Sequence, residues 1–337
     1  MCMSLINLLK KKNNTTLFTT PSHAGKFCIL HKFYQWYKAD ISEIDALNPE
    51  EALKKAEKKA AQIYGTKYTK FLTNGSTSGI ITAILASKPK KILIWENSHP
   101  CHKNGGMLSG SEVIEYSLPY DNELGIYRAI TLNRVKELIE SHCPDTLVIT
   151  SPTYEGFVAD IKSISELCHA HKITLIVDEA HGALYPFSDN LPESAVKYAD
   201  FTVQSLHKTA GGINPTALLH SNNINPKEAF NIINTTSPSY PMLATIEANI
   251  NFLNSTRGKR HIENLIKNIK SLGLPQLNDD PTKILLKGGE KLSEELFNSY
   301  NIEDVRANKK TTKLLCGIGT DKKKLDRLKK ALRNFGF

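Results

Sequence analysis

The sequence predicts an α/β fold in which a mostly parallel sheet is flanked by helices, followed by a smaller α+β domain. Two observations support this prediction. Short apolar, β-branched runs alternate along the chain with segments of helical period. This order is expected when parallel strands are joined by crossover helices. Runs such as "ITLIV" are also apolar without alternation, which is typical of strands covered on both faces.

The elements of the large domain are expected in a regular order. A first helix is expected over 48–65, where Asn48 can cap the start and Gly65 ends it. Strands are expected at 68–73, 91–96, 146–151, 173–179, 200–205 and 216–220. Helices between them are expected at 76–87, 132–142 and 161–171.

The pattern changes near residue 241. Residues 241–258 predict one long helix with four inward positions, Leu243, Ile246, Ile250 and Leu253. A strand, helix, strand and helix are then expected at 282–288, 291–300, 310–318 and 321–335. We therefore divide the chain into an N-terminal arm (1–30), a large domain (31–250) and a small domain (251–337).

Composition excludes several classes of protein. The net charge is +9, but much of the excess lies in the first and last expected helices, and no nucleic-acid recognition motif accompanies it. No apolar run approaches the roughly 18–20 residues of a membrane helix, and the start does not read as a secretory signal. The six cysteines form no C-x-x-C pair, and no metal site is expected. We expect a cytoplasmic protein with reduced thiols.

Polar residues follow several expected strands, at the edge where open parallel sheets bind ligands. Gly75, Ser76 and Thr77 begin a helix, where free amides favour a phosphate; a plain Ser/Thr cap is the alternative. Asp178 directly follows an apolar run, with His181 three residues later. A buried carboxylate needs a cationic or hydrogen-bonding partner, and a turn bonded to backbone amides is the alternative.

Two further strand ends are followed by residues that can take part in catalysis, namely histidines and a lysine. His99 and His102 follow the second expected strand, although a lone histidine is more often structural. Lys208 stands in "VQSLHKTAGG", between Ser205, His207 and a glycine pair. A lysine in an interior cleft has its ammonium form destabilised, so its amine can form a Schiff base with an aldehyde. A polar turn is the alternative.

One ligand would use all four places. Pyridoxal 5'-phosphate carries an aldehyde for the lysine and a ring nitrogen for the aspartate. Its ring can be covered by a histidine, and its phosphate suits a helix N-terminus. The combination is more specific than any single site.

With these residues in place, the chain resembles the ornithine/lysine/arginine decarboxylase family within the aspartate-aminotransferase-like (fold-type I) pyridoxal enzymes. The resemblance runs in order from about residue 17 to the end. It is carried by "TPSHAGK", "TNGSTSGI", "CHKN", "SPTYEGFVADI", "VDEAHGALYPF", "VQSLHKT", "ALLH", "SPSYPMLATIE", "DPTKILLKGGEKLSEELFNSYNIEDV" and "LLCGIGTDKKKLDRLKKAL".

The resemblance implies a role for each site residue. Lys208 would carry the cofactor, Asp178 would pair with the ring nitrogen, and His102 would stack on the ring. His181 would lie near the ring hydroxyl. The phosphate contacts would be Ser76, Thr77, Ser205 and His207. The resemblance also implies a homodimer with active sites at the subunit boundary, where residues 237–241 are expected.

The chain departs from the family pattern in three places. Ser22 and Ala24 replace the Gly and Lys of the opening motif. His99 and Pro100 stand where Arg-Asn commonly precedes Cys-His-Lys. The chain ends at Phe337, where members usually continue into a further region.

The expected activity is decarboxylation of a basic amino acid (lysine, ornithine or arginine), giving an amine and carbon dioxide. Another pyridoxal reaction (transamination, aldol cleavage or elimination) and an inactive cofactor-binding subunit are alternatives. Glu155 and Glu179 are candidates for a cationic side chain. An aminotransferase would need an arginine for the substrate carboxylate, and neither Arg306 nor Arg327 lies in an assignable motif.

Overall fold

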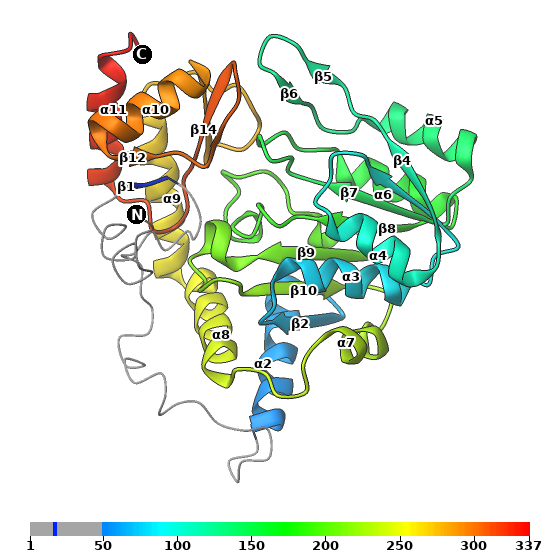
Figure 1. Ribbon diagram of the computed structural model, residues 1–337. Coiled ribbons are helices and arrows are strands. Elements are labelled where there is room, and N and C mark those ends of the chain that lie inside the picture. Colours follow the sequence, from blue (N-terminus) through cyan, green and yellow to red (C-terminus); the bar gives the residue numbers. More distant parts are fainter. Residues whose placement is uncertain (1–15, 19–48) are drawn as a thin grey trace, which may run out of the picture.

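The computed structural model describes residues 16–18 and 49–337 and has two lobes (Figure 1). The large lobe contains a seven-stranded sheet in the order β2-β10-β9-β8-β7-β3-β4. Its strands are β2 (Tyr68–Leu72), β3 (Lys91–Trp95), β4 (Glu112–Tyr116), β7 (Thr146–Thr150), β8 (Thr174–Asp178), β9 (Phe201–Ser205) and β10 (Ala217–Ser221). The predicted fold class is confirmed.

One strand differs from the parallel pairing that we expected. β10 runs antiparallel to both of its neighbours, β9 and β2, whereas β9, β8, β7, β3 and β4 are parallel. The connection between β9 and β10 contains only a wide helical turn, Leu206–Ala210, and a short loop. Because no crossover helix returns the chain to the other end of the sheet, β10 can only pair antiparallel.

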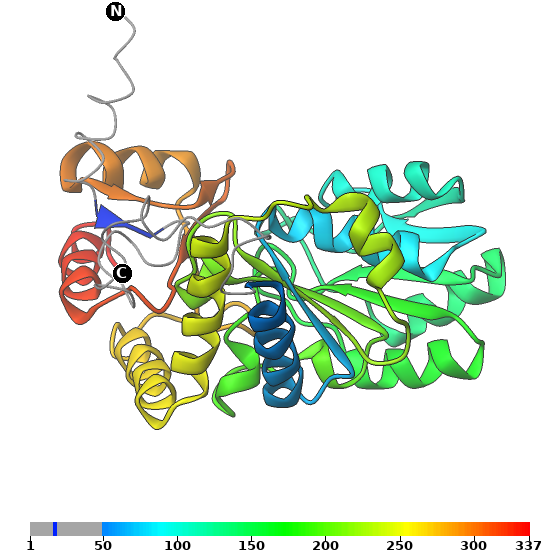
Figure 2. The same ribbon diagram turned by 90° about the horizontal axis from the view of Figure 1, so that it is seen from below.

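Helices cover both faces of this sheet (Figure 2). One face carries α3 (Gly75–Ser87), α4 (Cys101–Ser109) and α7 (Lys227–Ile233). The other carries α2 (Pro49–Tyr64), α5 (Leu132–His142) and α6 (Ile161–Ala170). Along β3, Ile92 and Ile94 belong to the core under α3, while Leu93 and Trp95 belong to the core under α5 and α6. Burial on both faces explains why the strand sequences do not alternate.

Helix α4 is not among the helices expected from the sequence, and its glycines explain why. Gly105 and Gly106 lower its helix propensity, so the sequence carries little helical signal. The same glycines let the helix pack closely, because a Cβ on Gly105 would lie 2.6 Å from Ile84 Cδ1. Strand β4 and the short hairpin strands β5 (Tyr120–Asp121) and β6 (Ile126–Tyr127) were also not expected.

The predicted long helix is two helices, α8 (Tyr240–Asn254) and α9 (Thr256–Lys270). Between them Ser255 leaves the helical conformation, with ψ 156°, and its Oγ accepts a hydrogen bond from the amide of Gly258 at 3.0 Å. The four positions predicted to face inward all lie on α8 and are buried. They are Leu243, Ile246, Ile250 and Leu253. Periodicity therefore predicted the buried face but not the break.

The small lobe contains the predicted strand, helix, strand and helix. These are β11 (Lys283–Lys287), α10 (Gly289–Tyr300), β14 (Thr311–Leu315) and α11 (Lys322–Arg333). β14 lies between β11 and β13 (Arg306–Ala307) in an antiparallel sheet. β1 (Thr16–Leu17) pairs in parallel with β12 (Ile302–Glu303). The lysine-rich α11 buries Leu325, Leu328 and Leu332, as expected for a solvated helix packed on a core.

The proposed domain boundary between residues 250 and 251 falls inside α8, and the division into domains stays a prediction. Most of the proposed arm (1–30), Ser22, Ala24 and Asn48 lie outside the described residues.

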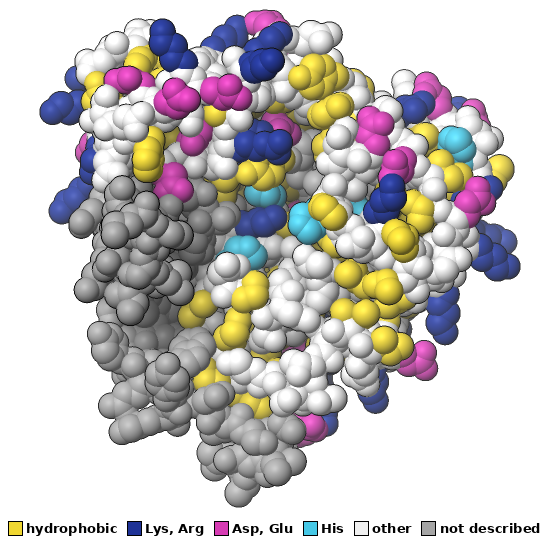
Figure 3. All heavy atoms as spheres, viewed as in Figure 1, with side chains coloured by type: hydrophobic (Ala, Val, Ile, Leu, Met, Phe, Trp, Pro, Cys, Tyr) yellow, Lys and Arg dark blue, Asp and Glu magenta, His cyan; other side chains and the backbone are white. Residues whose placement is uncertain are grey.

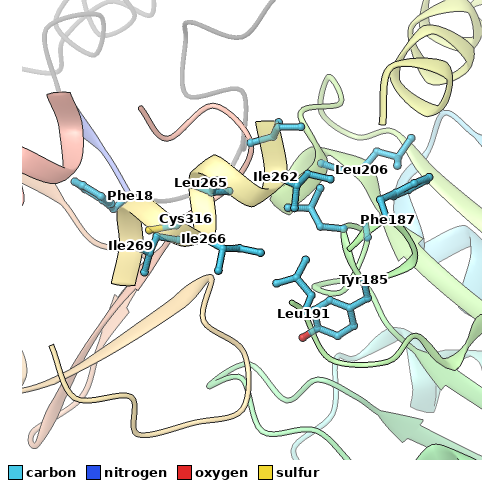
Figure 4. Close-up of a cluster of buried hydrophobic side chains, with 14 of the residues drawn as sticks. Phe18, Tyr185, Phe187, Leu191, Leu206, Ile262, Leu265, Ile266, Ile269 and Cys316 are labelled. Carbon is cyan, nitrogen blue, oxygen red and sulfur yellow. The ribbon is translucent and has the colours of Figure 1, made fainter. Parts of the chain in front are cut away.

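The two lobes share one hydrophobic core (Figure 4). On α9, Ile262, Leu265, Ile266 and Ile269 are buried between the lobes. They belong to the same cluster as Leu206 of the large lobe, which is fully buried. Burying such side chains contributes about 1.5–3 kcal/mol each. This packing fixes the turn that follows β9 relative to the small lobe.

Among the residues described, none of the helices combines the length and apolar character that a membrane span requires.

Replacing Ser255 with alanine should lower the free energy of unfolding by about 1 kcal/mol, because the first turn of α9 loses its side-chain cap. Urea unfolding followed by circular dichroism measures this loss. Ser271→Ala is the control: its hydroxyl donates to the Asn268 carbonyl at an exposed helix end, so we expect a change within about 0.5 kcal/mol. Equal losses in the two variants would contradict the capping role.

Candidate active site

A cavity of about 600 Å³ opens between the lobes at the carboxyl ends of the parallel strands. Its walls come from the residues after β3, β7, β8 and β9, from the β5–β6 hairpin, and from β13 and β14 of the small lobe. Figure 3 shows histidine side chains (cyan) and basic side chains of the Lys/Arg type (dark blue) gathered in the hollow at this place. The position is the one where open α/β sheets bind ligands.

Asp178 is the last residue of β8 and lines this cavity. Its Oδ2 lies 2.9 Å from Nε2 of His102, and its Oδ1 accepts from the amide of Ala180 at 3.1 Å. Burial alone would raise the pKa of Asp178. The bond and charge of His102, the charge of Lys208 and the Ala180 amide outweigh burial and lower the pKa below its usual value. The carboxylate is therefore ionised.

Lys208 lies in the wide helical turn after β9, and its Nζ is 3.3 Å from Nε2 of His181. Burial lowers the pKa of Lys208, although Asp178 and Cys101 act in the opposite direction. Burial, together with the charge of Lys208, also holds the pKa of His181 well below its usual value. An amine with a lowered pKa beside a neutral imidazole is suited to Schiff-base chemistry.

Asp178 and Lys208 line the same cavity. β8 and β9 are parallel neighbours, so their carboxyl ends meet at one edge of the sheet. This placement is the condition on which the pyridoxal hypothesis depends. A planar ring that reaches both residues fits a cavity of this size. The ionised carboxylate can accept a hydrogen bond from the ring nitrogen, and the lysine amine can react with the aldehyde.

Two of the four expected phosphate contacts, Ser76 and Thr77, lie in the first turn of α3. Asn74 precedes this helix without a side-chain capping bond, and Ser78 Oγ donates to Asn74 Oδ1 at 2.8 Å. The alternative to phosphate binding, a plain serine or threonine cap, is therefore not found at the start of α3. The helix amides that a phosphate would use are left without a side-chain cap.

The other two expected phosphate contacts, Ser205 and His207, lie next to the start of β10. Ser205 is fully buried, and its Oγ has no partner among the described residues. His207 Nδ1 lies 3.2 Å from the carbonyl oxygen of Thr216. A Cβ on Gly75 would lie 3.7 Å from Pro215, so the two segments are neighbours. None of the four belongs to the set of residues that lines the cavity.

The two histidines after β3 lie in different environments. His99 lines the cavity, and its Nδ1 is 3.0 Å from Sγ of Cys101. His102 is fully buried, bonds Asp178 and takes no part in the cavity wall. The stacking role that the resemblance implies for His102 stays a prediction.

The two candidate carboxylates for a cationic side chain are both engaged. Glu155 lines the cavity but pairs with Lys313, with Nζ to Oε1 at 2.5 Å. Glu179 accepts bonds of 2.6–2.7 Å from Ser194 Oγ, the Ala195 amide and Gln204 Nε2, and it does not line the cavity. Burial raises the pKa of Glu179 to about 7. Glu179 therefore links the loop that follows β8 to the loop that precedes β9.

The sequence did not predict a role for Tyr154, which follows β7, or for Lys313 and Arg306 of the small lobe, although all three line the cavity. Tyr154 lies with its ring 5.2 Å from that of His181. Lys313 Nζ lies 4.4 Å and the Arg306 guanidinium carbon 5.7 Å from the Tyr154 ring centre. Tyr154 stands in the quoted motif "SPTYEGF", but Arg306 has no local signal. Arg327 bonds the Tyr300 carbonyl and lies outside the cavity wall.

Solved structures of other proteins share this fold. The structure of Escherichia coli constitutive lysine decarboxylase matches with a TM-score of 0.74 at 22% identity, covering 98% of this chain and 60% of that one. Alanine–glyoxylate aminotransferase from Nostoc sp. matches with a TM-score of 0.67 at 14% identity, covering 90% of this chain and 92% of that one. The fold is that of the fold-type I pyridoxal enzymes.

Sequence comparison identifies the family within this class. The profile of "Orn/Lys/Arg decarboxylase, major domain" matches residues 5–279. Arginine decarboxylase of Bacillus anthracis is 31% identical over 335 residues, covering 87% of this chain and 68% of that protein. Constitutive lysine decarboxylase of Escherichia coli is 27% identical over 300 residues, covering 78% of this chain and 42% of that protein.

The chain belongs to the Orn/Lys/Arg decarboxylase family, a family of enzymes that use pyridoxal 5'-phosphate. The predicted family, enzyme class and cofactor are confirmed. The chain spans 60% of the solved lysine decarboxylase and 42% of its curated sequence.

Glu179→Gln should lower the free energy of unfolding by about 1–3 kcal/mol, because an NH2 group would replace one of the two oxygens that now accept hydrogen bonds from Ser194, Ala195 and Gln204. Urea unfolding at neutral pH measures the change. Glu137→Gln, on the exposed face of α5, is the control and should cost less than about 0.5 kcal/mol. If the two variants were equally stable, the Glu179 network would have no structural role.

Proposed function

We propose that this chain catalyses the pyridoxal phosphate-dependent decarboxylation of a basic amino acid, giving an amine and carbon dioxide. The observation that carries the proposal is the placement of ionised Asp178 and amine-bearing Lys208 on one cavity. Membership of the Orn/Lys/Arg decarboxylase family and similarity to a protein named arginine decarboxylase support the basic substrate.

Each proposed cofactor contact uses a group whose environment suits it. Lys208 would attach the aldehyde carbon through Nζ, and Asp178 would hold a proton on the ring nitrogen. His181, beside Nζ of Lys208, would lie near the ring hydroxyl. The phosphate would be held by Ser76, Thr77, Ser205 and His207. When bound, pyridoxal phosphate supplies an electron sink for the pair of electrons left by the broken α-carbon bond.

The residues of this chain make that chemistry possible in two ways. Asp178 remains a carboxylate because His102 and the Ala180 amide donate to it, so it can keep the ring nitrogen protonated. Lys208 would also serve as a proton carrier beside the substrate. With its lowered pKa, Lys208 can take up a proton and deliver it to the substrate α-carbon, and His181 Nε2 lies within reach to exchange that proton.

Lys208→Ala should abolish turnover, with a loss of at least about 10³-fold, and should remove the visible absorbance of the lysine-linked cofactor. Absorbance spectra and amine production measure the two effects. Lys197→Ala, an exposed lysine paired with Glu193, should leave both unchanged. A Lys208→Ala protein that is yellow and active would refute the assignment.

A second candidate function is transamination, and the position of Arg306 favours it. The guanidinium lies on the small-lobe wall of the cavity, where it could bind a substrate carboxylate as a bidentate partner. Holding that carboxylate would favour reactions that retain it.

Product analysis separates the two candidates. We expect the cofactor-saturated enzyme, incubated with lysine, ornithine and arginine in turn, to release carbon dioxide and the matching amine in equal amounts. Mass spectrometry of the amine and trapping of the gas measure both. A keto acid formed without carbon dioxide would support transamination, and no turnover of any amino acid would support an inactive subunit.

The proposal includes a homodimer with active sites at the subunit boundary, in the cytoplasm. Exposed apolar side chains on α4 and α7, with Met107 68%, Leu108 63% and Ile232 76% exposed, support an interface on this side of the sheet. Sedimentation of the cofactor-loaded protein tests the dimer.

A further inference from the structure

We propose that a second pocket, on the large lobe, binds a small primary alkyl amine in its charged form. The inference goes beyond the proposed function and does not depend on it, because amine binding here requires neither the cofactor nor turnover. The pocket has a volume of about 290 Å³ and shares no lining residue with the cavity lined by Asp178 and Lys208. Ligand pockets mostly measure about 300–1,000 Å³, so a pocket of this size suits a small molecule.

The pocket lies between the last turn of α2 and the segment that joins β8 to β9. Ile63 and Tyr64 come from α2, and Tyr185 and Pro186 come from a 3₁₀ turn of that segment. The rest of the wall comes from residues between 188 and 197. Figure 4 shows Tyr185 and Leu191 of this wall. Both are buried in the core that the two lobes share, so packing fixes this part of the wall.

The hydroxyl group of Tyr64 is an unsatisfied hydrogen-bonding group at this pocket. Tyr64 lines the pocket and is 6% exposed, and its hydroxyl is buried without a hydrogen-bond partner among the described residues. Phe187 and His220 hold its ring, with ring centres at 5.4 and 4.3 Å. Native structures rarely leave a buried hydroxyl unpaired unless a water or a ligand bonds to it. Tyr64 therefore indicates an occupant that forms a hydrogen bond.

The charged residues of the wall favour a cation as the occupant. Asp189 and Glu193 both line the pocket, and Asp189 takes part in no ion pair among the described residues. Lys197 is the lysine of the wall, and its Nζ already pairs with Oε1 of Glu193 at 3.2 Å. A negatively charged ligand would therefore meet two carboxylates and a lysine that is already neutralised.

A further carboxylate lies behind the wall. Ser194 lines the pocket, and its Oγ donates to Oε2 of Glu179 at 2.7 Å. Burial and, to a smaller extent, the charge of Glu179 raise the pKa of Tyr64, so the field of this carboxylate reaches the tyrosine. A positive group beside Tyr64 would be attracted to Glu179. An ammonium group can also donate a hydrogen bond to the phenol oxygen, which can accept one.

The apolar part of the wall suits an alkyl chain. Its members are Ile63, Pro186, Leu191, Pro192 and Val196. Methylene groups packed against these side chains would be removed from water, which favours binding. A primary ammonium group on a short alkyl stem therefore matches the apolar wall, the carboxylates and the unpaired hydroxyl together.

Binding of n-butylamine to the cofactor-loaded protein tests the inference. Saturation-transfer NMR measures the dissociation constant, and the visible band of the cofactor, which reports amine at the other cavity, should respond equally in all variants. We expect Tyr64→Phe to weaken binding about 3–10-fold, the size of one hydrogen bond. Asp189→Asn should weaken it about 2–5-fold. n-Butanol, with the same stem and no charge, should bind at least about 10-fold more weakly than the amine.

Tyr300→Phe and Asp326→Asn are the matched controls. The Tyr300 hydroxyl bonds Asn334 and Asp326 pairs with Lys322, both on the small lobe and outside the pocket wall. Both variants should bind the amine within about 2-fold of the wild type. Tyr64→Phe removes only an unpaired hydroxyl, so without amine it should resist urea at least as well as the wild type.

Four results would overturn the inference. Wild type, Tyr64→Phe and Asp189→Asn binding the amine equally would place the amine elsewhere. Equal binding of amine and alcohol would remove the role of charge, and no binding of the amine would leave water as the occupant. A Tyr64→Phe protein less stable than the wild type without amine would mean that the hydroxyl has a protein partner. The proposed function is tested separately by product analysis, and its failure would leave amine binding at this pocket unchanged.

Discussion

The buried carboxylate of Asp178 is the constraint on which the rest of the site depends. A carboxylate taken out of water is stable only with donors or positive charge close by. Here His102, the Ala180 amide and Lys208 supply them. His102 is in the first turn of α4, so α4 must pack tightly on α3, and Gly105 permits this approach. Helix packing and the ionisation of one strand-end carboxylate are thus parts of a single arrangement.

The small lobe is bound to the site by polar contacts as well as by the shared core. Lys313 on β14 pairs with Glu155 after β7, and Lys283 on β11 donates to the Thr153 carbonyl at 2.7 Å. Asn278 Nδ2 donates to the Glu155 carbonyl at 2.6 Å. A buried ion pair adds little net stability, but it penalises any other arrangement of the two lobes. These contacts therefore fix the shape of the cavity more than they stabilise the fold.

The features of the fold and of the site that depend on local sequence patterns could be predicted from the sequence alone. Asp178 and Lys208 each follow an apolar run, and parallel neighbours bring such ends together, so their meeting was predictable. The direction of β10 depends on how the chain returns after a short turn, which no periodicity records. Arg306 lies on a two-residue strand, and only its pairing with β14 brings it to the cavity. The separate environments of His99 and His102 depend on where α4 begins, and the glycines conceal that helix.

The charge on the cavity wall bears on how a basic substrate could be recognised. Among the described residues, the carboxylates that line the cavity are Asp178 and Glu155, and both already have cationic or hydrogen-bonding partners. Arg306 lies on the same wall and suits the carboxylate of an amino acid better than a cationic side chain. A cationic side chain would be repelled there and would extend away from the small lobe. In the proposed dimer, with its sites at the subunit boundary, the groups that accept the cationic side chain would come from the partner subunit. Substrate choice would then be a property of the assembly, while the proposed chemistry at the α-carbon would depend on Asp178 and Lys208.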